Sequence, residues 1–140
     1  MTEERLLDLE GAEGKVLAEE ATKLLLEKLG ENVTMFDVAK YTSITEFYVN
    51  ATGRSHSHVA ALADELADNF EDRGMPPLRI EGKKGNSWIL VDFGSLIVNV
   101  FDSDGRGFYN FDRLLPAESQ VNIDYLIKIV DNKFNINKKD

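Results

Sequence analysis

A helix-forming segment that lies between β-rich segments is the feature that most limits how this chain can fold. Residues 44–51 and 96–101 are rich in β-forming side chains and predict strands, whereas apolar residues from Val59 to Phe70 recur at helical spacings. A strand, a right-handed helical crossover and further strands form a sheet with helices packed against it. We therefore predict an α/β fold built on a mixed sheet.

Further periodic segments extend this pattern along the chain. Leu17, Ala21 and Leu25 share one helical stripe, and Gly30 is a natural stop for that helix. The expected elements are, in order, a helix at 13–29, strands at 33–38 and 44–51, a helix from a Ser55 or Ser57 cap to about Gly74, strands at 78–81, 88–91 and 96–101, and helices at 108–115 and 122–130.

The segment Asp92-Phe93-Gly94-Ser95 joins two of the predicted strands. If Phe93 and Gly94 form a two-residue hairpin loop, Trp88 lies directly across from Asn99. After the second strand, residues 102–105 (D-S-D-G) predict a solvated turn.

The length and composition fit one globular domain. The chain has 140 residues, of which 43% are hydrophobic and 29% are charged. We expect the domain proper at residues 13–116. Residues 1–12 predict a flexible N-terminal segment, and residues 117–140 predict a C-terminal helical extension with a polar tail.

The chain offers few ligands for a metal ion. It contains no cysteine, which excludes disulfides and thiolate–metal sites. Its two histidines, His56 and His58, stand two residues apart at the start of a predicted helix, so their side chains diverge. We therefore predict no metal site.

The charge balance limits the class of partner. Twenty-five acidic residues against 16 basic ones give a net charge of −9, which suits a basic protein and disfavours free nucleic acid. Solubility by itself would also account for this net charge.

No run approaches the roughly 20 apolar residues that span a bilayer. The acidic start is unlike a secretory signal or a mitochondrial presequence, so we expect a cytoplasmic protein without a membrane partner.

A glycine turn precedes the second predicted helix. Gly53 and Ser55 lie where a strand turns into a helix N-terminus, which predicts a relic anion site. Nucleotidyltransferases use a similar turn, but they also need strand carboxylates that converge on magnesium. Here Asp64, Glu65 and Asp68 follow on the helix instead. We predict that the protein is not an enzyme; the alternative is a nucleotide-binding or nucleotidyltransferase-like enzyme that uses this turn.

Six segments together resemble the ribosomal silencing factor family, also called Iojap or YbeB-like proteins. They cover about residues 14–116 and are, in order, S-I-T-E-F at 43–47, T-G-R-S-H-S-H-V at 52–59, E-G at 81–82, W-I-L-V-D-F-G at 88–94, I-V-N-V at 97–100 and F-Y-N-F-D-R-L-L at 108–115. The chain departs from the family where Glu46 replaces an aspartate, Asn99 replaces a histidine and Leu115 replaces a tryptophan.

The resemblance implies a nucleotidyltransferase-like fold without catalytic carboxylates. It also implies a translational repressor that binds the large ribosomal subunit through that subunit's fourteenth protein. Bound there, the factor would sterically block joining of the small subunit and would need no cofactor.

The matching motifs and the suitability of acidic and aromatic side chains for a basic partner also suggest which residues bind it. We predict that the partner-binding residues are Glu46, Trp88, Asp92, Asn99 and Tyr109. A third reading is a homodimer that forms off the ribosome through exposed sheet, and such a dimer would compete with the ribosome if it used the same surface.

Overall fold

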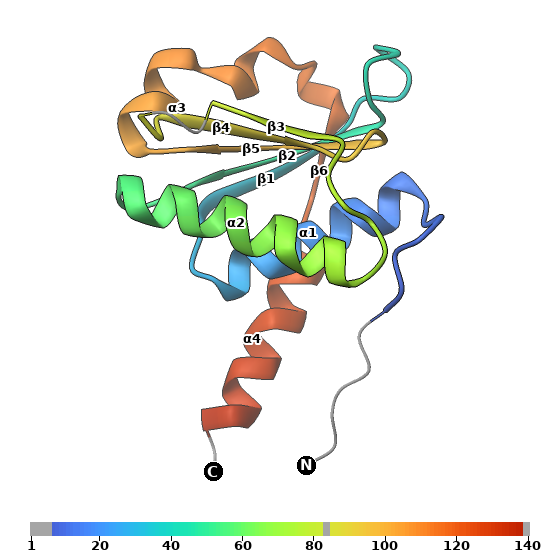
Figure 1. Cartoon of the computed structure of the whole chain (residues 1–140), viewed down its shortest axis with the longest axis vertical. Coiled ribbons are helices and arrows are strands. Elements are labelled where there is room, and N and C mark those ends of the chain that lie inside the picture. The colour runs from blue at the N-terminus through green and yellow to red at the C-terminus, as the bar shows by residue number, and fades with distance from the viewer. Residues whose placement is uncertain (1–6, 83–84, 139–140) are drawn as a thin grey trace.

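The computed structural model describes residues 7–82 and 85–138, which form a six-stranded sheet in the order β3-β4-β5-β2-β1-β6 (Figure 1). The strands are β1 (Glu31–Asp37), β2 (Phe47–Thr52), β3 (Arg79–Glu81), β4 (Trp88–Asp92), β5 (Leu96–Phe101) and β6 (Gln120–Val121). The helices are α1 (Gly14–Glu27), α2 (His56–Asp72), α3 (Ser103–Tyr109) and α4 (Asp124–Lys138), with short 3-10 turns η1 (Phe111–Leu114) and η2 (Ala117–Ser119).

The sheet is mixed, as the sequence predicts. Strands β2 and β5 pair in parallel, with Asn50 opposite Asn99, and α2, β3 and β4 lie between them in the chain. The pairs β1–β2, β1–β6, β3–β4 and β4–β5 are antiparallel. The mixed α/β architecture is therefore confirmed, whereas the nucleotidyltransferase-like assignment stays a prediction.

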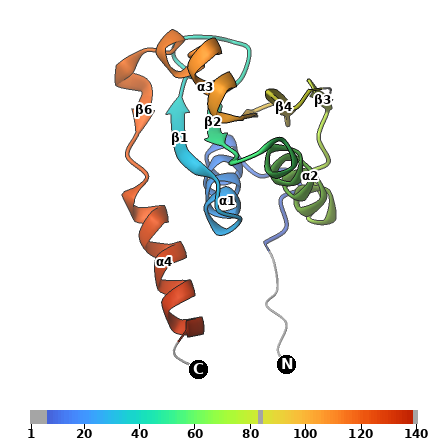
Figure 2. The same ribbon diagram turned by 90° about the vertical axis from the view of Figure 1, so that its left-hand side faces the viewer.

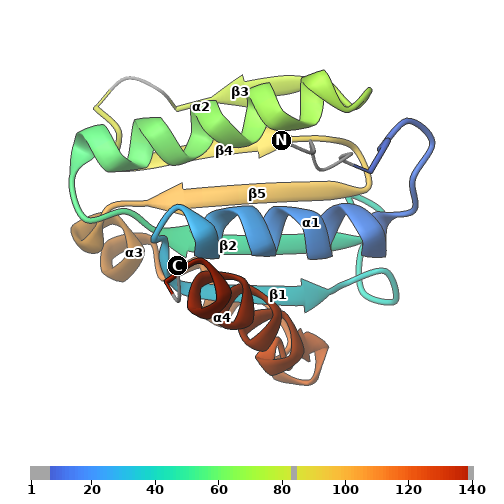
Figure 3. The ribbon, with the colours of Figure 1, turned by 90° about the horizontal axis from the view of Figure 1, so that it is seen from below.

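The two faces of the sheet differ in what covers them. Helices α1 and α2 cover one face, with α4 beside α1, and α3 lies on the opposite side (Figures 1 and 3). Because strand side chains alternate between faces, one set of strand residues meets the apolar stripes of α1 and α2 and forms the core. This set includes Val49, Ala51, Ile89, Val91, Val98 and Val100. We call the other face, which carries Asn50, Trp88 and Asn99, the open face.

The β4–β5 hairpin differs from its predicted register. Asp92 pairs with Ile97, and the Phe93 amide donates to the Leu96 carbonyl at 2.8 Å, so the two-residue loop is Gly94-Ser95. Gly94 has a φ of +91°, and the first loop position of a type II′ turn requires such a value, which explains the shift by one residue. Trp88 consequently lies opposite Phe101, not Asn99 as predicted.

The segment after β5 also differs from the prediction. Residues 102–105 form no solvated turn: Asp102 caps α3, and its Oδ1 accepts from the Gly105 amide at 2.6 Å. The predicted helix at 108–115 therefore begins earlier, and it breaks at Asn110, which has a left-handed φ of +52°. Two glycines, Gly105 and Gly107, weaken the local helical signal, and the cap outweighs them.

Both ends of the described chain pack on the domain. In the predicted flexible segment 1–12, residues 1–6 lie outside the described residues, but Leu9 is fully buried and its amide donates to the Arg73 carbonyl. Helix α4 continues to Lys138 and does not stop near residue 130; Leu126 joins the core, and Val130 is also buried. The division at residues 13–116 stays a prediction.

Candidate functional site

Three of the five predicted partner-binding residues meet on the open face. Trp88 at the start of β4 and Tyr109 at the end of α3 have ring centroids 4.6 Å apart. The indole Nε1 of Trp88 donates to Asn99 Oδ1 on β5 at 2.8 Å. Trp88 and Asn99 share this face because Asn99 is two positions along β5 from Phe101, the residue opposite Trp88.

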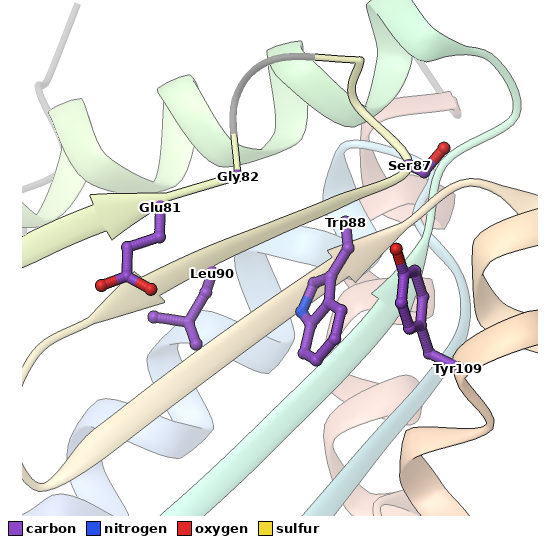
Figure 4. Close-up of a pocket in the computed structure, with 6 residues that line it drawn as sticks. All are labelled: Glu81, Gly82, Ser87, Trp88, Leu90 and Tyr109. Atoms are coloured by element: carbon purple, nitrogen blue, oxygen red, sulfur yellow. The ribbon is translucent and has the colours of Figure 1, made fainter.

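A hollow of about 340 Å³ lies beside this aromatic pair (Figure 4). Glu81, Leu90 and Trp88 point to the same side of the sheet, where Tyr109 of α3 faces Trp88, and these four residues line the hollow together with Gly82 and Ser87. Its walls are aromatic and aliphatic, with one carboxylate at the edge, which also pairs with Arg79. Such a hollow suits a long side chain with an apolar stem and a polar or cationic end.

Exposed apolar side chains lie on α3 and on the 3-10 turn that follows it. Phe108 in α3 is 82% exposed, and Leu114 in η1 is 75% exposed. Both lie in the segment that carries Tyr109, itself 42% exposed. Apolar groups gathered on one segment in this way are typical of a protein-interaction surface.

Trp88 is held by rings on three sides. Its centroid lies 5.2 Å from Phe101 and 5.8 Å from Phe111, besides the contact with Tyr109. The Phe111 ring also packs edge-on against Tyr48 of β2 at 5.1 Å. These contacts join η1 to the sheet and leave Trp88 half-buried.

A chain of polar side chains continues from Trp88 across the sheet. Asn99 Nδ2 donates to Asn50 Oδ1 at 3.0 Å, and Asn50 Nδ2 donates to Asp112 Oδ1 at 3.0 Å. Asn50 and Asn99 have no exposed surface. The Asn99 side chain is therefore out of reach of a partner, and its link to the surface is its hydrogen bond with Trp88.

The other two predicted residues lie at the far end of the sheet. Asp92 is on the open face but four residues along β4 from Trp88, about 13 Å at strand spacing. Its Oδ2 pairs with Arg79 Nε at 3.0 Å, and its Oδ1 accepts from the Gly94 amide at 2.8 Å. Burial, and then the negative charge of Asp92, raise the pKa of the Tyr48 phenol nearby.

Glu46 lies one residue before β2, not inside a strand as the segment 44–51 predicts. Its Oε1 comes within 2.6 Å of the position that a Cβ on Gly14 would take, so the carboxylate faces the start of α1. That helix has no acidic side chain in its own first turn. Together with Glu13 at the N-cap, Glu46 provides negative charge, which a helix N-terminus favours.

A family model, "Ribosomal silencing factor during starvation", matches residues 12–139 of the chain. The chain belongs to the ribosomal silencing factor family. A relative so named from Halalkalibacterium halodurans is 30% identical over 101 residues, which are 72% of this chain and 86% of that protein. A crystal structure of a Chromobacterium violaceum protein is 28% identical, has a TM-score of 0.70 and covers 73% of this chain and 85% of that chain.

The family also extends to proteins of eukaryotic organelles. The mouse protein "Mitochondrial assembly of ribosomal large subunit protein 1" is 27% identical over 99 residues, which are 69% of this chain and 43% of that protein. Among bacterial relatives the shared name is ribosomal silencing factor, which supports a role in translation regulation.

The glycine turn before α2 is largely occupied by its own hydrogen bonds. The Gly53 amide donates to the Phe101 carbonyl at 2.7 Å, and the Arg54 amide donates to His58 Nδ1 at 2.9 Å. Ser55 Oγ caps α2 by accepting from the His58 amide. A Cβ on Gly53 would lie 2.7 Å from Val59, so close packing against α2 accounts for the glycine.

Two carboxylates and one guanidinium surround this turn. A hollow of about 610 Å³ beside it is lined by Arg54, Ser55, His56, Ser57, Asp102, Ser103 and Asp104. Asp102 Oδ2 contacts His56 Nε2 at 2.9 Å. Carboxylates next to a helix N-terminus oppose the binding of a phosphate there.

Within residues 7–82 and 85–138, no group of three or more His, Asp or Glu side chains is placed to hold a metal ion. No helix in this described part is long and apolar enough to cross a membrane.

Sequence reasoning missed Asn50, Arg106 and Asp112. Asn50 stands two residues after Tyr48 in a predicted strand, so alternation alone could have placed it on the face of Asn99. Asp112 lies in the F-Y-N-F-D-R-L-L motif, but no spacing rule connects it to β2. Only the folded chain brings these residues together.

Proposed function

We propose that this protein binds the large ribosomal subunit with its open face and sterically blocks joining of the small subunit. The observation that carries the proposal is a set of aromatic and apolar side chains: half-buried Trp88 and exposed Tyr109 beside the hollow, and exposed Phe108 and Leu114 in the segment that carries Tyr109. An apolar centre with aromatic anchors is what protein interfaces use for affinity. The family name supports the ribosome as the partner.

The chemistry of the chain favours a basic ribosomal protein as the direct contact. The net charge of −9 attracts a basic surface, and Glu81 lines the hollow next to Trp88. A Lys or Arg side chain could lay its stem on the rings and point its cation at this carboxylate. The resemblance to the family indicates the fourteenth protein of the large subunit as that partner.

The five predicted residues take different parts in this proposal. Trp88 and Tyr109 contact the partner directly, and Asn99 acts by holding Trp88. Asp92 and Glu46 belong to the acidic surroundings at the far end of the sheet, where they favour approach of a basic partner more than tight contact. A homodimer that used the open face would compete with the ribosome.

Repression in this scheme needs no chemical step. The factor occupies a surface that the small subunit has to reach, so its effect depends on affinity and on its concentration relative to large subunits. A cytoplasmic location, expected from the sequence, fits this role.

Co-sedimentation with purified large subunits at low salt tests the proposal. Phe108→Asp and Leu114→Asp are expected to lower the bound fraction on the order of tenfold, because each puts a charge into an apolar contact. Since both side chains are mostly exposed, folding should be unaffected. Ile129→Asp is the matched control, since Ile129 is 49% exposed on α4, on the helix-covered side (Figure 2).

Two results would contradict the proposal. One is a wild-type protein that does not sediment with large subunits. The other is binding by Phe108→Asp and Leu114→Asp that equals the Ile129→Asp control. A sucrose-gradient assay then tests the steric step: wild-type protein should reduce formation of joined subunits from purified halves, and the two interface variants should not.

A further inference from the structure

The polar chain across the open face has a defined direction. It runs from Trp88 Nε1 to Asn99, from Asn99 to Asn50 and from Asn50 to Asp112, with donor–acceptor distances of 2.8, 3.0 and 3.0 Å. It crosses β4, β5 and β2 and ends on η1, so it connects the sheet to the segment that covers it.

The two ends of this row of hydrogen bonds, Trp88 and Asp112, are chemically different. An indole N–H can only donate a hydrogen bond, whereas an ionised carboxylate can only accept one. Asn99 and Asn50 lie between them, and each accepts with its oxygen on the Trp88 side and donates with its nitrogen on the Asp112 side. An amide can otherwise be turned by 180°, but here the two ends allow one orientation only.

Asp112 also anchors α3 through its second oxygen. Asp112 Oδ2 accepts from Arg106 Nη2 at 3.0 Å and from Thr34 Oγ1 at 2.8 Å. Arg106 in turn donates to Thr52 Oγ1 at 2.8 Å and to the Asn32 carbonyl at 2.9 Å. The helix that carries Tyr109 is thereby attached to both β1 and β2.

We propose that Asp112 is the positioning residue of the partner-binding face. Through Asn50 and Asn99 it fixes the Trp88 indole, and through Arg106 it fixes the helix that places Tyr109 against that indole. A preorganised pair of rings binds without first losing side-chain freedom. The effect on ribosome binding rests on the proposed function, but the effect on Trp88 does not.

The substitution Asp112→Asn should disturb this row of hydrogen-bonded side chains, because it replaces an acceptor by a donor. The new amide has one donor group, which must face either Asn50 Nδ2 or the Arg106 and Thr34 side. If it faces Asn50, both asparagines must turn, and the Asn99 nitrogen then meets the Trp88 N–H, donor against donor. If it faces Arg106, the anchor of α3 is weakened instead, because two donors oppose each other.

The single tryptophan of the chain supplies the readout. Hydrogen exchange of the Trp88 indole N–H, followed by NMR, is compared with exchange of the backbone amides of β5 in the same sample. In Asp112→Asn the indole is expected to exchange on the order of tenfold faster while the β5 amides keep their rates. A merely destabilised protein would instead speed up both sets.

Two more variants complete the test. Asp104→Asn removes the same charge from an exposed position on α3 and should leave the indole unchanged. Asn50→Leu removes the hydrogen bonds that connect Asn99 to Asp112 but keeps the Asp112–Arg106 pair. It should therefore free the indole without loosening α3. Asn50→Leu also provides the test if Asp112→Asn fails to fold.

The outcomes separate this inference from the proposed function. Faster indole exchange in Asp112→Asn and Asn50→Leu, but not in Asp104→Asn, supports the positioning role. Indole exchange that stays at the wild-type rate in both Asp112→Asn and Asn50→Leu, or that follows the β5 amides, overturns it. If the indole is freed and co-sedimentation with large subunits is unchanged, positioning stands and the use of Trp88 in ribosome binding is contradicted.

Discussion

Replacing Arg73 by Met removes a buried guanidinium that connects three parts of the fold. The Arg73 side chain, which follows α2, donates to Glu20 Oε1 of α1 at 2.6 Å, to Asn69 Oδ1 at 3.0 Å and to the Leu7 carbonyl at 2.8 Å. Methionine keeps the apolar stem, so the substitution removes the charge and the donors while it preserves much of the packing.

The expected cost follows from the surroundings of Glu20. Removing one partner of a buried ion pair costs about 3–5 kcal/mol, because the remaining charge is left uncompensated. Glu20 keeps a second partner, Lys23 Nζ at 2.8 Å, and its side chain is 17% exposed. We therefore expect the lower end, a loss of about 3 kcal/mol in the free energy of unfolding.

Urea unfolding followed by tryptophan fluorescence measures this loss. Lys28→Met is the matched control: the Lys28–Glu65 pair is 45% and 46% exposed, so its removal should cost less than about 0.5 kcal/mol. In a double-mutant cycle with Glu20→Gln, Arg73→Met should show a coupling of about 1–3 kcal/mol. A loss below about 1 kcal/mol for Arg73→Met, or no coupling, would refute the reasoning.

The same pair predicts a pH dependence. Burial by itself raises the pKa of Glu20, but hydrogen bonds and charges from Lys23 and Arg73 outweigh it and lower the pKa below 4.5. A carboxyl with a lowered folded pKa stabilises the protein above its unfolded pKa, and this is lost as pH falls through the folded value. The stability difference between wild type and Arg73→Met should therefore shrink in acid, and a constant difference would contradict the linkage.

Further predictions concern Gly53, Tyr125 and Glu46. Gly53→Ala should destabilise the fold by about 1–3 kcal/mol in urea unfolding, because the new Cβ would lie 2.7 Å from Val59; an unchanged midpoint would contradict this packing role. Calorimetry with ATP and magnesium should give no binding heat, and measurable binding would support the nucleotide-binding alternative. Burial and a hydrogen bond to Glu19 raise the pKa of Tyr125 to about 12, so Glu19→Gln should lower it in an ultraviolet titration, and an unmoved pKa would exclude Glu19 as a cause. Glu46→Arg should weaken binding to large subunits by charge reversal and cost about 0.3–1 kcal/mol at the start of α1, and unchanged affinity would remove Glu46 from the interface.

Local patterns in the sequence determined the elements and their buried faces. The apolar stripes of α1 and α2 and the β-rich runs of β2 and β5 depend on spacings of a few residues, so they can be read without a structure. The mixed sheet follows from their order. The acidic charge and the absence of cysteine are set by composition alone.

Tertiary structure decided which polar side chains meet on the open face. The hydrogen bond between Thr34 and Asp112 joins residues 78 positions apart, and the one between Asn50 and Asp112 joins residues 62 apart. No local spacing encodes such pairs, because they depend on strand order and on where α3 starts. The sequence pointed to Trp88, Asn99 and Tyr109 as a group, but the β4–β5 register and the cap at Asp102 place them in contact. The register is settled by backbone hydrogen bonds between strands, which form only when the sheet forms, and the cap by a hydrogen bond from the Gly105 amide to the Asp102 side chain.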